Sequence, residues 1–181
     1  MTAARHLPAP PVMLESYDVD GSVLGKGSFG IVVEAVKRDT QELLAVKIVQ
    51  RNSLDAKDIA NCRNEAEILS KLHHPNIIRF HSYLEDPTGN YLFTEVIRGG
   101  ELFDRLIERN GFVECESKTI TSKILSAVAY CHSRGIVHRD IKAENVLLVS
   151  RSDDGDFDLR VIDFGLAAIA KGSSLKGELG M

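Results

Sequence analysis

The chain has 181 residues, which is enough for one good-sized domain with a buried core. Hydrophobic residues make up 44% of the sequence and charged residues 27%, which excludes disorder as the dominant state. The 22 basic and 26 acidic residues give a formal net charge of −4. This balance argues against general nucleic-acid binding, because phosphates are bound by clustered Lys and Arg.

Three widely spaced cysteines, with no Cys-x-x-Cys pair, predict neither a zinc site nor a disulfide framework. They fit a reducing compartment, so we expect a cytoplasmic protein, with the nucleus as the alternative. No apolar run approaches the roughly 18 residues that span a bilayer, and we expect no membrane span.

The first part of the chain is rich in strand signals. Residues 1–16 carry Pro8, Pro10 and Pro11 and are expected to form a flexible leader. β-Branched and apolar residues then predict three strands, at 19–24, 31–36 and 43–49. The connections between them are too short for crossovers, so we expect an antiparallel sheet.

A helix and two more strands are predicted next. The helix covers residues 55–72, with Ser53 as its N-cap. Its apolar stripe consists of Ile59, Cys62, Ala66, Leu69 and Leu72. Pro75 ends this pattern, because proline cannot continue a helix. The strands are predicted at 77–84 and 91–97.

The pattern becomes helical after Gly99-Gly100, which we expect to act as a hinge. Helices are predicted at 101–109 and 116–134. Loop and strand at 136–149, a short strand at 159–162 and a loop at 170–181 complete the chain.

A glycine-rich turn, Gly25-x-Gly27-x-x-Gly30, joins the first two predicted strands. Glycines allow close backbone approach, so the N–H groups of such a turn can bind phosphate oxygens. The alternatives are an ordinary hairpin turn and a dinucleotide-binding fingerprint. The fingerprint needs a helix after Gly30, whereas the β-branched residues there predict a strand.

Two charged residues stand out in apolar surroundings. Lys47 interrupts the apolar strand Ala45–Val49, where a lysine is costly unless it is paired or directed at an anion. Glu65, on the predicted helix, is the candidate partner. The alternative is an edge lysine that faces water.

The densest run of ionisable residues extends from His138 to Asn145, and Asp163-Phe164-Gly165 follows the last predicted strand. Taken alone, the run could be a solvated turn. Asn145 and Asp163, however, offer the hard oxygen ligands that Mg²⁺ prefers.

These motifs, in this order, resemble the protein kinases over residues 17–181. The resemblance implies an α+β, two-lobed fold, with a complete β-rich N-lobe at 17–98 and a partial helical C-lobe at 99–181. It also implies ATP and Mg²⁺ as the nucleotide and the metal.

The resemblance further assigns residues to the nucleotide. Lys47 would hold the α- and β-phosphates, fixed by Glu65, and Thr94 would be the gatekeeper. The positions implied to bind ATP are Gly25, Lys26, Gly27, Gly30, Val32, Ala45, Lys47, Thr94, Glu95, Val96, Glu101, Leu147 and Asp163.

Four residues receive roles in the transfer itself. Asn145 and Asp163 would hold Mg²⁺, and Asp140 would orient the substrate hydroxyl and accept its proton. Lys142 would stabilise the transferring phosphoryl group. A lysine at this position resembles the Ser/Thr kinases, so the implied partner is a protein with Ser or Thr at its target site.

Within the family, the sequence is most similar to the calcium/calmodulin-dependent and calcium-dependent protein kinases. The segment Gly99 to Arg105 resembles theirs, as does the acidic turn 150–158. Glu101 and Glu144 lie where basophilic members bind an Arg upstream of the target, although Glu101 could instead reach the ribose. The acidic turn fails the EF-hand pattern, so a calcium sensor would have to lie outside this chain.

The sequence has no Ala-Pro-Glu motif after Gly165, so we expect a C-terminally truncated kinase domain. Two functions compete: a Ser/Thr kinase catalytic domain, and a truncated non-catalytic module that binds ATP or a partner. We expect the isolated chain to bind ATP–Mg²⁺ weakly and to transfer little or no phosphate. A rate in the ordinary kinase range of about 1–100 s⁻¹ would contradict this expectation.

Overall fold

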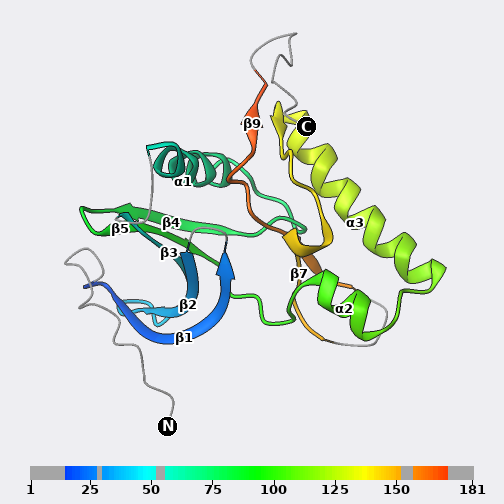
Figure 1. The fold of residues 1–181 in the computed structure, drawn as a ribbon, viewed down its shortest axis with the longest axis horizontal. Helices are drawn as coiled ribbons and strands as arrows, with labels where there is room; N and C mark the ends of the chain where they lie inside the picture. The colour runs from blue at the N-terminus through cyan, green and yellow to red at the C-terminus, as the bar shows by residue number, and fades with distance from the viewer. Residues whose placement is uncertain (1–14, 28–29, 52–55, 152–156, 171–181) are drawn as a thin grey trace. The chain divides into compact units, whose positions relative to one another are not determined.

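The computed structural model describes residues 15–27, 30–51, 56–151 and 157–170 (Figure 1). Most of the expected leader, the expected N-cap Ser53 and residues 171–181 lie outside these ranges. The described chain divides into two compact units. The first unit takes its residues from 1–66 and 80–96, and the second from 67–79 and 97–181.

The first unit is built on an antiparallel sheet of five strands in the order β1-β2-β3-β5-β4 (Figure 1). Its strands are β1 (Tyr17–Gly27), β2 (Gly30–Lys37), β3 (Leu43–Gln50), β4 (Phe80–Glu85) and β5 (Gly89–Thr94). In the turn from β2 to β3, the Gln41 N–H donates to the Lys37 carbonyl at 2.8 Å. Gln41 adopts a φ of +57° there. The sheet is antiparallel, as predicted.

One face of this sheet carries an apolar core. Tyr17 stacks on Phe93, with ring centroids 4.1 Å apart. The core consists of Tyr17, Val33, Ala35, Leu44, Val46, Tyr91 and Phe93. Because side chains alternate along a strand, Lys47 and the other residues between these core positions point to the opposite face.

Helix α1 (Ala56–Leu69) follows β3. Four of the five residues in its predicted apolar stripe are buried, and Ile59 is half-buried. The helix ends at Leu69, earlier than predicted, because Leu72 N–H donates to the Leu69 carbonyl in a turn. Glu65 is also buried, at 5% exposure. A buried carboxylate of this kind requires a partner.

In the part of the second unit that the structure describes, two helices and two small sheets follow Ile97. Helix α2 (Leu102–Glu108) and helix α3 (Glu114–Ser133) match the predicted helices to within two residues. The α3 N-terminus is capped by Glu116, whose carboxylate accepts the Val113 N–H at 3.1 Å. Of the helices that the structure describes, none is long and apolar enough to cross a membrane.

The short strands of the second unit pair in two antiparallel ladders. Strand β7 (Val146–Leu148) pairs with β8 (Leu159–Val161), and β6 (Ile136–Val137) pairs with β9 (Ala168–Ile169). A 3₁₀ turn at Ala143–Asn145 leads directly into β7. The sequence does not predict β9, which has only two residues and therefore too little pattern.

One predicted strand is wrong in its extent. Residues 77–84 were expected to form a single strand, but β4 begins only at Phe80. Ile77 instead forms an isolated parallel bridge with Val161. The apolar character of Ile77 and Ile78 reflects burial against β8 rather than membership of the first sheet.

Candidate active site

Lys47 and Glu65 form a close ion pair in the first unit. The Lys47 Nζ lies 2.8 Å from Glu65 Oε2, and the two side chains are 19% and 6% exposed. The alternation of β3 directs Lys47 away from the apolar core, and the spacing of α1 buries Glu65. The structure therefore brings together the two residues that the sequence paired, and it excludes an edge lysine in water.

The glycines of the turn between β1 and β2 have different surroundings. A Cβ added to Gly30 would lie 2.1 Å from the Ile48 carbonyl oxygen, so the sheet itself requires glycine there. Among the residues that the structure describes, a Cβ added to Gly25 would meet no atom within 4 Å. Packing against these residues therefore does not explain Gly25, whereas an open backbone suits close approach of a phosphate. Lys26 and Gly27 lie on β1, paired with Ile31 and Gly30.

The strand that follows excludes one alternative from the sequence. Gly30 begins β2, and no helix starts after the glycine turn. A dinucleotide-binding fingerprint needs that helix, because its N-terminus binds the pyrophosphate. Gly25 and Gly27 therefore lie on β1 and Gly30 on β2, two strands that pair antiparallel.

The remaining nucleotide candidates of the first unit lie along β2, β3 and the end of β5. Val32 pairs with Lys47, and Ala45 pairs with Thr94. Ala45 is buried, and the Thr94 hydroxyl donates to the Glu95 carbonyl at 3.3 Å. Glu95 and Val96 follow β5 without regular secondary structure and are half-buried.

In the second unit, Asp140 is held by two neighbours. Lys142 Nζ lies 3.0 Å from Asp140 Oδ2. Asn145 Nδ2 donates to Oδ2 and to the main-chain oxygen of Asp140, both at 2.8 Å. The hydrogen bond from Lys142 is the main reason that the pKa of Asp140 lies below its usual value, and Asp140 in turn raises the pKa of Lys142. Asp140 is therefore a fixed carboxylate that remains ionised at neutral pH.

Asn145 and Asp163 are tied together through the main chain. The Ile162 N–H donates to the Asn145 carbonyl at 2.9 Å, and Asp163 is the next residue. The Asn145 side chain uses Nδ2 for its two bonds to Asp140, so its amide oxygen is the atom suited to a cation. An amide oxygen and a carboxylate are a donor set that fits Mg²⁺.

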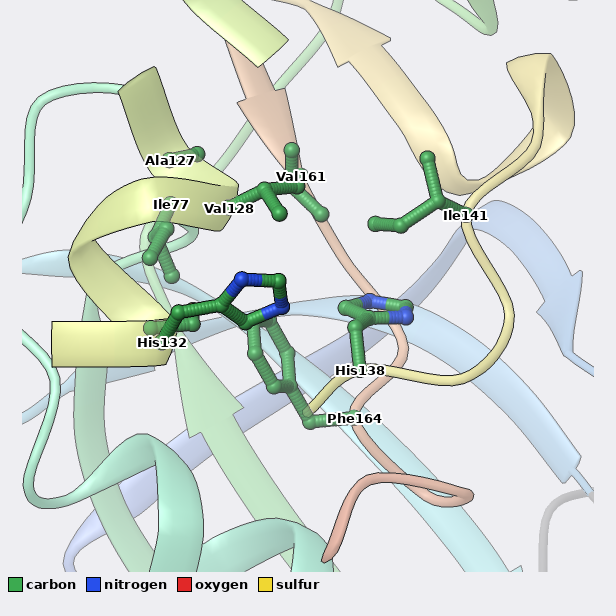
Figure 2. Close-up of a pocket in the computed structure, with 9 residues that line it drawn as sticks. Ile77, Ala127, Val128, His132, His138, Ile141, Val161 and Phe164 are labelled. Carbon is green, nitrogen blue, oxygen red and sulfur yellow. The ribbon is translucent and has the colours of Figure 1, made fainter. Parts of the chain in front are cut away.

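His138 and Phe164 support the main chain next to Asp140 and Asp163. His138 is 4% exposed, and its ring meets the ring of Phe164 edge to face with centroids 4.5 Å apart. Its Nδ1 accepts the Asp140 N–H at 3.3 Å, so Nε2 carries the proton toward the Ile162 carbonyl at 3.0 Å. Burial lowers the pKa of His138 and keeps the ring neutral. Figure 2 shows the two rings side by side in a small pocket with Ile77, Val161 and residues of α3.

Glu101 and Leu147 meet in an antiparallel bridge just before α2. Burial is the main cause that raises the pKa of Glu101, and the nearby Asp104 and Glu144 raise it further. Three carboxylates therefore influence one another at this end of α2. A cationic side chain placed among them would relieve their repulsion.

Backbone strain at the site is a feature that the residue pattern did not indicate. Arg139 and Asp163 adopt φ values of +70° and +61°, in the left-handed region that non-glycine residues seldom occupy. Such strain concentrates at functional sites, where the surrounding bonds enforce it. Here the Arg139 Nε donates to the Leu166 carbonyl at 2.6 Å. No sequence signal reveals these angles, because both residue types are ordinary in loops.

Comparison with known proteins identifies the same family that the sequence motifs resemble. The family model described as the protein kinase domain matches residues 19–180. The chain belongs to this family.

Similar proteins carry names from the calcium-regulated kinases. Calcium-dependent protein kinase 5 of Plasmodium berghei is 41% identical over 152 residues, which cover 84% of this chain and 26% of that protein. Calcium/calmodulin-dependent protein kinase type II of Caenorhabditis elegans is 40% identical over 153 residues, covering 84% and 21%. The human type 1B enzyme is 40% identical over 152 residues, covering 84% and 43%. The chain thus spans about a quarter of the length of the first curated relatives it matches.

Proposed function

We propose that this chain is a Ser/Thr protein kinase catalytic domain, which transfers the γ-phosphoryl group of ATP to protein hydroxyls. The observation that carries the proposal is the arrangement around Asp140. Lys142 and Asn145 fix its carboxylate, and Asn145 is bonded to the residue that precedes Asp163. Membership of the protein kinase family supports the same activity.

In the first unit, Lys47 is the proposed ligand of the ATP phosphates. Its ion pair with buried Glu65 fixes the ammonium on the α1 side of β3. The Gly25 main chain, with no neighbour where a Cβ would lie, would approach the same phosphates. Val32, Ala45, Thr94, Glu95 and Val96 are proposed to contact the adenine.

In the second unit, Asn145 and Asp163 are the proposed magnesium ligands. Among the described residues, no three His, Cys, Asp and Glu side chains cluster into a metal site. The remaining ligands would therefore be phosphate and water oxygens, as is usual for Mg²⁺. Bound there, the ion would neutralise charge on the phosphates.

Asp140 and Lys142 are proposed to act on the hydroxyl and the phosphoryl group. The Asp140 carboxylate would accept a hydrogen bond from the substrate hydroxyl and aim its oxygen at the γ-phosphorus. As the new oxygen–phosphorus bond forms and the bond to ADP breaks, the proton passes to Asp140. The lowered pKa of Asp140 makes it a weak base, so orientation is its main contribution. Lys142 would offset negative charge on the moving group.

The carboxylates at α2 support a preference for basic substrates. Glu101, Asp104 and Glu144 together favour a cation, and the raised pKa of Glu101 reflects their crowding. We therefore propose a Ser/Thr target preceded by Arg. Equal phosphorylation of peptides with and without that Arg would overturn this preference.

We further propose how the protein is regulated and where it is located. The names of the relatives refer to calcium and calmodulin, which supports regulation by a calcium sensor outside this chain. All three cysteines are free thiols, which supports a cytoplasmic location, with the nucleus as the alternative.

The experiment combines nucleotide binding with phosphoryl transfer. We expect the chain to bind ATP in the presence of Mg²⁺, as measured by calorimetry. Lys47→Met should weaken binding by about tenfold or more, because it removes a half-buried cation from the phosphates. Lys37→Met is the matched control. That lysine lies on β2 and pairs with Asp39 at 3.5 Å, so its loss should leave binding unchanged.

Transfer to an Arg-containing peptide separates the two proposed classes. If the chain phosphorylates the peptide and Asp140→Ala abolishes this transfer, the result supports the kinase function. Binding of ATP without any transfer supports the alternative, a non-catalytic ATP-binding module. A chain that binds no ATP contradicts both the kinase and the ATP-binding module, and leaves only a module that binds a partner.

A further inference from the structure

Strand β8 has a neighbour on each of its edges. Strand β7 pairs with one edge, and the loop from His73 to Ile78 follows the other. The Val161 N–H donates to the Asn76 carbonyl at 2.9 Å, and the Ile78 N–H donates to the Val161 carbonyl at 3.0 Å. These two bonds form an isolated parallel bridge between Ile77 and Val161. The loop therefore bonds to the edge of β8 that β7 does not occupy, and β8 leads directly toward Asp163.

The side chain of Asn76 strengthens this contact. Asn76 is 8% exposed, and its Nδ2 donates to the Leu159 carbonyl at 3.2 Å. One residue thus bonds to β8 through both its main chain and its side chain. A buried amide with this bond is costly to replace by a group that cannot donate.

The other side of the loop is fixed to α3. The His73 N–H donates to the Tyr130 hydroxyl at 2.8 Å, and the ring of His74 lies 5.0 Å from the Tyr130 ring. His74 Nδ1 accepts the Asn76 N–H at 3.1 Å, so its protonated Nε2 faces Ser126 Oγ at 3.2 Å. Helix α3 therefore determines where Asn76 lies.

Apolar packing supports the same connection. Figure 2 shows Ile77 beside Ala127 and Val128 of α3, in the pocket that Val161 also lines. Ile77 and Val161 are 2% and 1% exposed. The loop is packed between α3 and β8, and movement of the loop would therefore disturb β8.

We propose that Asn76 is a positioning residue for Asp163. Asn76 holds Leu159 and Val161, and the next residues, Ile162 and Asp163, follow directly on the same strand end. The Ile162 N–H reaches the Asn145 carbonyl only when β8 is in register. Asn76 therefore sets the spacing between the two proposed metal ligands without contacting either. This inference rests on the proposed function, because it takes Asp163 to be a metal ligand.

The test uses the substitution Asn76→Asp in the 181-residue chain. A carboxylate of the same size cannot donate to the Leu159 carbonyl. Two quantities are measured: amide hydrogen exchange at Val161 and Ile162 without ligand, and the affinity for Mn²⁺ with a non-hydrolysable ATP analogue. We expect exchange at both amides to be at least about tenfold faster. We expect Mn²⁺ affinity to fall about tenfold, as for other residues that orient metal ligands.

The matched control is Asn90→Asp. Asn90 is also buried, at 1% exposure, but lies on β5 of the first unit, where its Oδ1 accepts a hydrogen bond from the Tyr83 hydroxyl. The Asn90→Asp substitution should leave hydrogen exchange at the β8 amides and the affinity for Mn²⁺ unchanged, even if it lowers the free energy of unfolding. If Asn76→Asp does not fold, Tyr130→Phe removes the anchor of the loop on α3, and smaller changes in the same direction are expected.

The outcomes separate this inference from the proposed function. Faster exchange with unchanged Mn²⁺ affinity would show that the loop is only structural and would overturn the inference. Unchanged exchange would overturn the connection through β8. A wild-type chain that binds no Mn²⁺ with nucleotide would overturn the proposed function and the metal role of Asp163, while the exchange result would still decide the connection between the loop and β8.

Discussion

Two glycines of one motif illustrate how neighbouring residues can be required for different reasons. Gly30 faces the Ile48 carbonyl of the adjacent strand, whereas Gly25 faces open space. A motif read only as a spacing of glycines cannot separate these cases, because the difference lies in what the next strand places opposite each one.

Alanine substitutions at the two glycines should therefore have opposite consequences. Gly30→Ala would put its Cβ 2.1 Å from a main-chain oxygen, and the sheet would have to shift, at a cost of roughly 1–3 kcal/mol of unfolding free energy. Gly25→Ala should leave stability nearly unchanged but weaken ATP binding. Urea unfolding and calorimetric titration measure the two effects. A Gly25→Ala chain that binds ATP as tightly as wild type would contradict the proposed contact with phosphate.

At the scale of elements, the sequence predicts best what repeats regularly. Helices α2 and α3 match their predicted ranges closely, since each has an apolar face at helical spacing and a clear end. The pair Lys47 and Glu65 was also predictable, because a charged residue in an apolar strand calls for a partner.

Other features depend on contacts between distant segments and were not predictable. Ile77 and Ile78 read as strand residues, yet their partner is β8, more than eighty residues later, rather than β5. The left-handed conformations of Arg139 and Asp163 likewise follow from the bonds around them. The amino-acid composition around each residue does not indicate which distant segments pair.

Arg109 connects three segments of the second unit. Its Nη2 lies 2.8 Å from Glu116 Oε1, and its guanidinium lies 5.6 Å and 5.9 Å from the rings of Phe112 and Phe157. The two phenylalanine rings meet edge to face, with their centroids 5.3 Å apart. Arg109 thus holds the end of α2, the start of α3 and the residues before β8 together.

We expect Arg109→Met to lower the free energy of unfolding by about 1–2 kcal/mol, because it removes a half-buried ion pair and a cation on two rings. Lys71→Met is the control, since Lys71 forms an exposed pair with Glu67 one helical turn away. Such an exposed pair should contribute little to stability, because water and salt screen its charges. Chemical denaturation measures both variants, and equal losses would show that the rings add nothing at Arg109.

At the scale of the whole molecule, the buried His138 and the half-buried His74 lie in the same unit. Burial lowers the pKa of both His74 and His138 below the value that they have in an unfolded chain. Each also uses Nδ1 to accept a main-chain N–H two residues later. Protonation would remove that acceptor, so both histidines stabilise the second unit only in their neutral form.

The free energy of unfolding should therefore depend on pH in a definite direction. The unfolded chain binds protons at higher pH than the folded chain, so the contribution of these histidines is complete above pH 6.5 and declines as the pH falls below that value. Asp140 and Glu85, whose pKa values are also lowered, add to the loss at still lower pH, whereas Glu101, whose pKa is raised, opposes it. We expect the protection factors for amide hydrogen exchange, which are corrected for the intrinsic pH dependence of exchange, to fall between pH 7.5 and pH 5.5 more in α3 and β8 than in β3 and β5. An equal fall in both units would show that these histidines do not control the acid sensitivity.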